Sequence, residues 1–593
     1  MKRISIVIIF IGLLSGCTKF LDKVPEDYVL PDNYYKTSQD LSNALNGVYD
    51  ILGKVELYGN FIPIQLNIGT DEAFYPLVGA AGVLANQFDP SDATINSLWN
   101  STYSGIDRAN LLLERIDGSN ADSATKSIIR GEALFLRAYY HFVLVSLFGD
   151  IPMKLTSTLN ITDVSQKRTP SNEIYTQITK DMMEAEGRVR SATQVKNGGH
   201  INKSAVRGIL ARVYLYWSGY PLFANKYDQV LKWALLVNQN NEHSLNNDYR
   251  QIFINYAQDK YDIKESIWEV EFFYPGINSY SEGGRLGNIN GVQCANLDSG
   301  YSYGQMNGTM KLFNSYGGTL AFSQDNRRDW AMANYKLTGV LPNIKTPITS
   351  TTIYDRNAAK WRREYEPYTS KDKNFTNENF PILRYSDVLL MIAEADNELN
   401  GPTLIGINAI NSIRERAYKS IKTVTVTTGG SGYTSIPSIS FVGGGGAGAT
   451  AYGIISGGQL KGITLSNCGY GYTSSPSVLI SGGGGGIGAT AYTELVTASD
   501  ADLTAVQTGD KDAFRQVIRE ERMRELCFEG HRRFDLIRWG NYIKYMNDYA
   551  STIVSVYPLA SIAGLNLTTR NTYLPIPSSE LSVNKLAVQN FGY

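Results

Sequence analysis

Apolar residues recur at helical spacing along most of the chain after residue 38. In the first such stretch, Leu41, Ala44, Leu45 and Val48 fall at positions i, i+3, i+4 and i+7, so they form one face of a helix. The same pattern returns at residues 98–116, 129–152, 171–189, 202–217, 227–240, 380–399, 405–420 and 512–542. We therefore predict a mainly α fold in which paired amphipathic helices stack as tetratricopeptide-like hairpins, although no clean consensus of about 34 residues repeats.

Two long stretches lack this periodicity and predict loops. Residues 60–96 are interrupted by Gly, Pro and Asp, and residues 272–318 are dense in Gly, Asn, Ser and Tyr. Aromatic residues are interleaved with the small ones in the second stretch, which favours ordered, functional loops over disorder.

A third pattern, alternation of apolar and polar residues, fills residues 423–496. It contains the runs "KTVTVTT", "PSISFV" and "PSVLIS", which are typical of strands and not of flexible linkers. The motif "GYTSIPS" at 432–438 recurs as "GYTSSPS" 39 positions later, and "GATAY" at 448–452 recurs 40 positions later. We predict a small β-module of two similar glycine-rich units that pack on each other.

The glycine runs inside this module raise the question of a phosphate-binding loop. "GGGGAG" at 443–448 and "GGGGIG" at 483–488 both match the G-x-G-x-x-G pattern. That motif must leave a strand and open a helix, whereas the residues that follow here read as strands. The glycines are therefore predicted to be turns and close-packing positions.

The N-terminus carries the features of an export signal. Lys2 and Arg3 precede an apolar run at residues 4–14, which is too short to span a bilayer. Leu14-Ser15-Gly16-Cys17 then resembles a bacterial lipobox. We predict cleavage before Cys17 and lipidation of its thiol, which would anchor the protein without a spanning helix. The alternative is an ordinary secretory signal with a chance cysteine.

Composition and motif spacing exclude several classes of chemistry. The formal charge of −1 gives no basic footprint for nucleic acid. The three remaining cysteines, at 294, 468 and 527, and the four histidines, at 141, 200, 243 and 531, show neither a disulfide framework nor metal-ligand spacing. No nucleophile elbow is present, and none of the 56 acidic residues stands out as a catalytic pair. We predict a binding protein without metal, cofactor or catalytic residue.

Several motifs together resemble the SusD/RagB family. They are "EALFLRAYYHFVLVSLFGDIP", "RYSDVLLMIAEADNEL", "EERMRELCFEGHRRFDLIRWG" and the terminal "LPIPSSELSVN", in addition to the lipobox. They fall in the family's usual order and span almost the whole mature chain. The resemblance implies a lipid-anchored protein on the outer face of the outer membrane, with a helical fold built on tetratricopeptide-like hairpins.

The resemblance also implies a function. Such proteins capture an oligomeric nutrient, usually a glycan, and work with a TonB-dependent transporter of the SusC type. Two alternatives remain open, namely the same scaffold binding peptides or another ligand, and a surface glycoside hydrolase. The implied organisation is a signal peptide at 1–16, a lipidated tether at 17–37, a helical-repeat part at 38–270, a loop-rich and C-terminal helical part at 271–422 and 497–593, and an inserted β-module at 423–496.

That module departs from the family pattern. The family usually joins "INAINSIRERAY" to "EERMREL" by a short connection, whereas about 100 residues lie between Ala417 and Glu520 here. Either the module is an accessory surface that contacts ligand or partner, or it is a neutral insertion at an exposed loop.

The motif at 520–540 is rich in charge. Glu521 with Arg524, and Arg522 with Glu525, are spaced to stabilise an exposed helix by roughly 0.2–0.5 kcal/mol a pair. Further charges at 529, 532, 533, 535 and 538 cluster around Phe534 and Trp539. We interpret the whole as an ion-pair network that fixes the helix to the scaffold, in preference to an acid/base site.

Glycan binding needs flat aromatic faces and planar polar groups, and the two loop stretches supply both. The predicted stacking residues are Tyr75, Trp99, Tyr280, Tyr301 and Tyr303, and the predicted polar contacts are Asp71, Arg285 and Asn290. Trp99 is also in helical phase with Tyr103 and Ile106, so core packing is an equal alternative for it. Ordinary loop packing is the alternative for each tyrosine.

Overall fold

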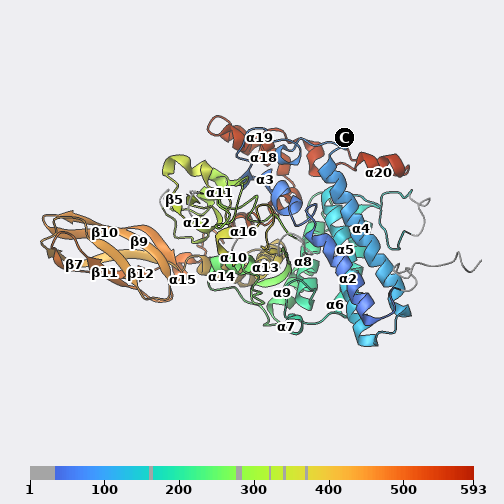
Figure 1. Ribbon diagram of the computed structural model, residues 1–593, viewed down its shortest axis with the longest axis horizontal. Coiled ribbons are helices and arrows are strands. Elements are labelled where there is room, and N and C mark those ends of the chain that lie inside the picture. Colours follow the sequence, from blue (N-terminus) through green and yellow to red (C-terminus); the bar gives the residue numbers. More distant parts are fainter. Residues whose placement is uncertain are drawn as a thin grey trace, which may run out of the picture.

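The computed structural model describes residues 34–158, 165–274, 283–319, 322–337, 339, 342, 344–367 and 371–593. A helical body forms most of the molecule, and six strands project from one end of it, opposite the helices at the start of the described chain (Figure 1). The mainly α fold predicted from the helical periodicity is confirmed.

Consecutive helices of the first half pack on one another. They are α2 (Ser38–Gly53), α4 (Ala93–Arg115), α5 (Ser123–Phe148), α6 (Ser171–Glu186), α8 (Lys203–Ser218) and α9 (Tyr227–Asn238). Local sequence sets their ends: Asp92 and Asp122 each accept two backbone N–H bonds at an N-terminus, and Gly149, with φ 72°, ends α5.

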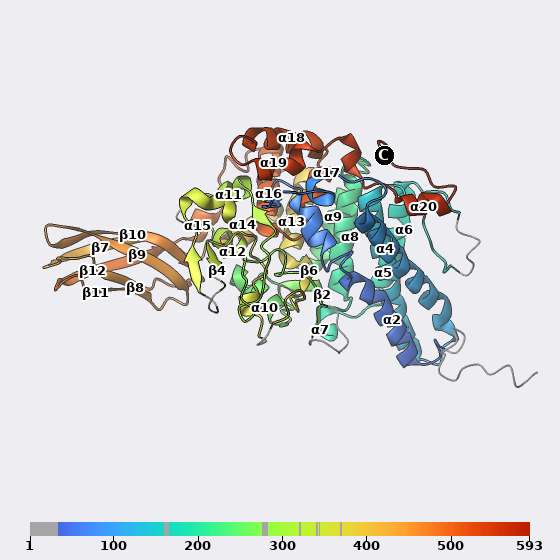
Figure 2. The ribbon, with the colours of Figure 1, turned by 45° about the horizontal axis from the view of Figure 1, so that its top comes forward.

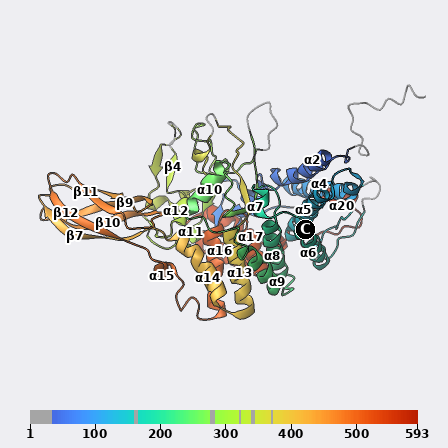
Figure 3. The same cartoon turned by 90° about the horizontal axis from the view of Figure 1, so that it is seen from below.

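The stack continues across a long gap in sequence. Helix α13 (Tyr385–Asn400) packs on α9, although residues 239–384 separate them, and it also contacts α14 (Leu404–Ala417) and α16 (Lys511–Leu526). Figure 3 shows the order from α2 and α4, through α8 and α9, to α13 and α14 beside the projecting strands. The hairpins therefore form one continuous scaffold.

Residues 380–384, which the periodicity assigned to a helix, are a strand. Strand β6 (Phe380–Arg384) pairs antiparallel with β2 (Ser266–Val270), and every residue of both strands is buried. A short apolar run does not distinguish a buried strand from a buried helix. Helix α13 begins only at Tyr385, where the paired segment ends.

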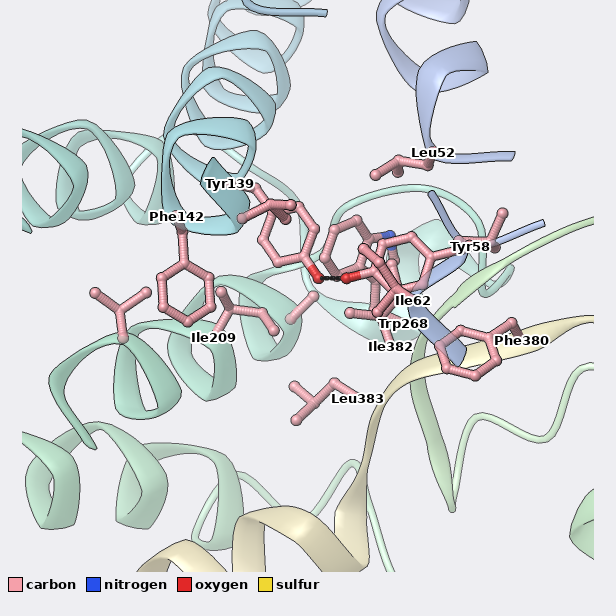
Figure 4. Packing of buried hydrophobic residues seen from close by; sticks show 14 of the residues in the cluster. Leu52, Tyr58, Ile62, Tyr139, Phe142, Ile209, Trp268, Phe380, Ile382 and Leu383 are labelled. Atoms are coloured by element: carbon pink, nitrogen blue, oxygen red, sulfur yellow. Dashed lines mark hydrogen bonds between the residues drawn. The ribbon is translucent and has the colours of Figure 1, made fainter. Parts of the chain in front are cut away.

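These strands carry the centre of the hydrophobic core. Trp268 of β2 meets Tyr139 of α5 edge to face, with ring centroids 4.8 Å apart, and Phe380 of β6 stacks on Tyr58 at 5.3 Å. The Tyr58 and Tyr139 hydroxyls share a hydrogen bond inside this core (Figure 4). Burying both hydroxyls is tolerable because each has the other as a hydrogen-bond partner.

The charged stretch 512–542, predicted as one helix, is two. Helix α16 ends at Leu526, and α17 (Arg532–Arg538) starts after a sharp turn in which Phe528 and Gly530 have φ of 63° and 75°. The Phe528 N–H donates to the buried Glu72 carboxylate at 2.8 Å, which holds the turn in place. A tertiary contact thus overrides a continuous helical pattern.

The six projecting strands form the β-extension, defined as residues 421–495. They are β7 (Ile421–Ser431), β8 (Ser438–Val442), β9 (Ala447–Ser456), β10 (Gln459–Tyr470), β11 (Ser477–Ser481) and β12 (Ile487–Leu495). β7 pairs with β12, β8 with β11 and β9 with β10, all antiparallel. The two sequence repeats are therefore interleaved instead of packing as separate units, because the first strand of each finds its backbone partner in the third strand of the other.

A glycine turn of each repeat also packs against a tyrosine of the other repeat. The Tyr433 ring of the first repeat lies under the glycine turn of the second, where a Cβ on Gly486 would come within 2.2 Å of Tyr433 Cδ1. Tyr472 and Gly446 repeat the arrangement, with a corresponding distance of 2.4 Å to Tyr472 Cγ. Gly446 and Gly486 are close-packing positions, since any side chain there would displace a buried tyrosine.

Side chains of the helical body contact the base of the β-extension. Phe322 packs against the cluster of Ile421, Leu465, Cys468 and Tyr472 at its base, and the Arg250 guanidinium lies over the Tyr470 ring. The remaining elements are short, and those that matter for function are introduced below.

Candidate functional site

The family-like charged motif forms a buried ion-pair network. Glu525 is fully buried and pairs with Arg327, Arg384 and Arg416 at 3.1, 3.0 and 2.6 Å. Burial favours its neutral form, but Arg416, Arg384 and Arg327 outweigh that effect and hold the Glu525 pKa well below its usual range. The predicted pair of Glu521 and Arg524 forms at 2.8 Å, but it is buried and not exposed. Arg522 pairs with Asp387 and Asp535 instead of Glu525, so most of these charges join separate elements inside the protein.

An aromatic surface lies on another face, where segments far apart in sequence meet. Tyr354 of the 3-10 turn η5 (Ser350–Asp355) stacks on Tyr557, with ring centroids 4.4 Å apart and planes 6° from parallel. Both rings are half-buried. Phe74 of β1 (Ala73–Phe74) supports them edge-on, at 6.1 Å from Tyr354 and 5.3 Å from Tyr557. We call Phe74, Tyr354, Tyr549 and Tyr557 the tyrosine platform.

Backbone pairing positions this platform. β1 pairs with β3 (Asn307–Gly308), and the Asn307 amide donates to the Tyr354 carbonyl at 2.8 Å. Tyr557 directly precedes α19 (Pro558–Leu565), and Tyr549 comes from α18 (Tyr542–Ile553). Beyond Phe74 in the chain, Leu77 and Val78 are exposed, at 49% and 85%. The rings are thus presented by a fixed scaffold next to an exposed apolar loop.

A cavity of about 410 Å³ adjoins the platform. Its aromatic members are Trp539 and Tyr545, and the amide side chains of Asn314, Gln516 and Asn541 also line it. The Trp539 indole N–H donates to Glu394 at 3.1 Å, which fixes the ring. We call this the Trp539 cavity; rings with planar polar groups around them suit a sugar unit.

Lys311 links the two features. Its ammonium lies 3.8 Å from the centroid of Tyr545 and 5.8 Å from that of Tyr549. Lys311 belongs to α11 (Met310–Ser315), which together with α16, α17, α18 and α19 forms the upper part of the molecule in Figure 2. Lys311 therefore lies between the cavity, which it lines, and the Tyr549 ring of the platform.

Four of the eight predicted ligand residues lie together elsewhere. Tyr301 and Tyr303 meet edge to face at 5.0 Å, and the Tyr303 hydroxyl donates to the Asn374 side chain at 3.3 Å. Arg285 donates to the Asn374 carbonyl at 3.0 Å. Asn290 is buried and accepts the Gly287 N–H at 2.9 Å, so it supports the loop from within. These residues form an ordered loop cluster.

The other four predicted residues are scattered. Asp71 is fully buried and accepts two 2.7 Å hydrogen bonds from Arg532, so it is part of an ion pair inside the protein. Trp99 is 2% exposed and packs edge-on against Phe148 at 4.9 Å. Tyr75 is half-buried and packs against the main core. Tyr280 lies outside the described residues, as does Cys17.

A larger hollow of about 700 Å³ runs beside Trp99 and Tyr103. Trp99 offers it little surface, and the Tyr103 hydroxyl is already bonded to the Pro152 carbonyl at 2.7 Å. The tyrosine platform differs from this hollow in that two half-buried rings lie parallel there, whereas Trp99, one of the two rings beside the hollow, is 2% exposed. Most of the Trp99 ring thus packs in the core, and its contact with a ligand stays a prediction.

Sequence reasoning missed the platform residues for an identifiable reason. Tyr354 and Tyr557 are about 200 positions apart, in segments without a motif. Trp539 was noticed, but as part of an ion-pair cluster. Only a three-dimensional contact could have connected them.

Two further findings concern the described residues alone. Within them, no group of three or more His, Cys, Asp or Glu is placed to hold a metal ion. Within the same ranges, no helix has the length and apolar character needed to cross a bilayer.

Comparison with known proteins gives consistent matches. The family described as "SusD family" matches residues 264–431 and 494–593, which flank most of the β-extension, and one described as "Starch-binding associating with outer membrane" matches 19–215. "SusD-like protein P25" of Formosa agariphila is 22% identical over the whole of both chains.

Solved structures share the fold. A SusD homolog from Bacteroides thetaiotaomicron has a TM-score of 0.77 and 24% identity, covering 95% of this chain and 98% of its own. A structure titled "Laminarin binding SusD-like protein" has a TM-score of 0.64 and 20% identity, covering 94% of this chain and all of its own.

Proposed function

Since the chain belongs to the SusD family, we propose that it captures an oligomeric glycan at the cell surface and delivers it to a SusC-like TonB-dependent transporter in the outer membrane. Lipidation at Cys17 would keep the protein at that membrane, facing outward. The proposal includes binding without hydrolysis.

The tyrosine platform is the observation that carries this proposal. The stacked tyrosines cover each other's inner faces, so the outer face of each is the flat apolar surface that would match the C–H face of a pyranose unit, and a rigid aromatic loses little entropy on binding. The adjoining Trp539 cavity has room for a further unit. The similarity to a laminarin-binding protein supports a glycan as the ligand class.

The direct test is binding of the mature protein to a panel of neutral oligosaccharides by titration calorimetry. If a sugar covers roughly a third of each ring, about 60 Å², each ring contributes about 1.5 kcal/mol, or roughly tenfold in affinity. Tyr354→Ala and Tyr557→Ala should each weaken binding by about that factor. Tyr452→Ala, on an exposed tyrosine of the β-extension, is the matched control.

Other outcomes separate the alternatives. Binding of peptides and of no oligosaccharide would replace the glycan by a peptide ligand on the same scaffold. Release of new reducing ends by the purified protein would show hydrolysis and end the binding-only proposal. Equal effects of the platform variants and Tyr452→Ala would show that the site lies elsewhere.

The transporter partner needs its own experiment. Co-expression with a TonB-dependent transporter encoded beside this gene, followed by purification through a tag on either protein, should recover both. Recovery of each protein alone from detergent-extracted outer membranes would contradict the proposed complex.

A further inference from the structure

One arginine of the Trp539 cavity, Arg519, forms no ion pair among the described residues. Arg519 lies over the Trp539 ring, with Cζ 4.7 Å from its centroid. Its Nε is buried, and none of the hydrogen bonds or ion pairs within the described ranges involves its guanidinium. Arg519 as a whole is half-buried and lines the cavity, so its buried Nε lacks an acceptor while the side chain is open to a ligand that could supply one.

The two other arginines at the same indole are already satisfied. Arg538, 5.1 Å from the ring centroid, donates to Glu394 and to Asp535. Arg532, 5.5 Å from it, donates to both oxygens of Asp71. The three share one aromatic ring, and only Arg519 lacks an anion.

The remaining lining does not neutralise Arg519. Lys311 is 3.2 Å from Asp71, the carboxylate that Arg532 also uses and to which the Tyr545 hydroxyl donates. Glu520 accepts from Gln516 and lies 3.7 Å from Arg524. The cationic side chains of Lys311, Arg519 and Arg532 thus outnumber the carboxylates of Asp71 and Glu520 by one.

The electrostatics agree with the geometry. Burial lowers the Arg519 pKa; Glu394 opposes this, and the Arg538 and Arg515 guanidinium groups lower it further. An oxyanion next to Arg519 would reverse the shift by supplying the missing negative charge. Arginine is suited to this, because its planar fork donates two parallel bonds to a carboxylate or sulfate.

We propose that the Trp539 cavity binds an acidic sugar unit of the glycan, whose carboxylate or sulfate is held by Arg519 while its ring packs at Trp539 and Tyr545. This inference rests on the proposed glycan function and adds the ligand's charge to it. The amides of Asn314, Gln516 and Asn541 are placed to bond the hydroxyls of the same unit.

The test is calorimetry of the mature protein with three probes: a hexasaccharide of uronic acid units, its fully methyl-esterified form, and a sulfated hexasaccharide. The acid should bind at least tenfold more tightly than the ester at low salt, and the preference should shrink as salt rises. Whichever of the uronate and sulfate probes binds more tightly identifies the source of the anion.

Arg519→Gln should bring the acid-to-ester ratio close to one. Arg515→Gln is the control, since Arg515 lies one turn away on α16, outside the cavity, and pairs with Glu398. An Arg519→Gln ratio equal to wild type would overturn the inference. Binding of neutral oligosaccharides without preference for either acid would also overturn it while leaving the proposed function intact, and failure to bind any oligosaccharide would remove both.

Discussion

Replacing Arg384 by methionine tests whether the charged motif acts as a structural lock. Arg384 is 1% exposed and lies 2.7 Å from Glu529, 2.9 Å from Glu265 and 3.0 Å from Glu525. Methionine fills much of the same space but leaves these carboxylates short of a partner. Glu529 retains Lys360, and Glu525 retains Arg416, whereas Glu265 retains only a 3.8 Å contact to Arg416 among its ion pairs.

The expected loss in unfolding free energy for Arg384→Met is a large fraction of the total unfolding free energy. Removing one partner of a buried ion pair costs about 3–5 kcal/mol, while proteins have a total unfolding free energy of about 5–15 kcal/mol. Urea denaturation followed by circular dichroism measures the change. Arg515→Met is the matched control, because Arg515 is 27% exposed in its pairs with Glu398 and Asp512, and it should cost about 1 kcal/mol.

Arg384→Lys extends the test to a variant that keeps the charge. Lysine can pair with one carboxylate but lacks the fork, so its stability should fall between wild type and Arg384→Met. If Arg384→Met were no less stable than Arg515→Met, the idea that the network locks α16 to β6 would be refuted.

Three further predictions follow from the fold. Gly486→Ala should destabilise the β-extension, because the added Cβ would come within 2.2 Å of Tyr433. Gly462→Ala is the control and should not, since its nearest contact would be at 3.7 Å. Thermal unfolding compares the two variants, and equal melting temperatures would contradict the packing of each tyrosine against the other repeat. Acidification should unfold the body: although burial favours its neutral form, Arg327 and Arg524 lower the Glu521 pKa to about 2. Such a carboxylate stabilises the fold above its unfolded pKa of about 4.3, and this contribution is lost as pH falls toward 2. Denaturation curves recorded between pH 5 and 2 measure the loss, and an unfolding free energy that did not change over this range would contradict the prediction. Replacing residues 423–496 by a short linker should leave glycan affinity unchanged within about twofold, because the tyrosine platform is on the body. A short linker can close the gap, since Ile421 and Leu495 are paired and the two ends of the β-extension are therefore close together. A tenfold loss of affinity would show that the β-extension contacts the ligand.

The helical scaffold was readable because its signal is local. Apolar spacing, aspartate caps and a terminal glycine locate the helices of the first half within a few residues, and each feature depends on neighbours in the chain. Local pattern failed where a tertiary contact decided the outcome. Residues 380–384 form a strand because they pair with β2. The predicted helix at 512–542 is interrupted where the Glu72 carboxylate accepts a hydrogen bond from the Phe528 backbone N–H.

The candidate site shows the same division more strongly. Loop composition pointed to Arg285, Tyr301 and Tyr303, and the structure does bring them together, yet Asp71 proved to be an interior partner of Arg532. Charge spacing in the motif at 520–540 indicated ion pairs but not their partners. Those partners, at 71, 327, 384, 387, 394 and 416, are remote in sequence.

By itself, the sequence determined the helical hairpins, the repeat within residues 423–496 and the resemblance to a glycan-capture family, because periodicity, repetition and ordered motifs are properties of a linear chain. Only the tertiary structure decided that the repeats exchange strands, that Tyr354 stacks on Tyr557 and that, of the three described arginines at the Trp539 ring, Arg519 is the one without an ion pair. Each of these depends on distances between residues far apart along the chain, and such distances are fixed when the core packs.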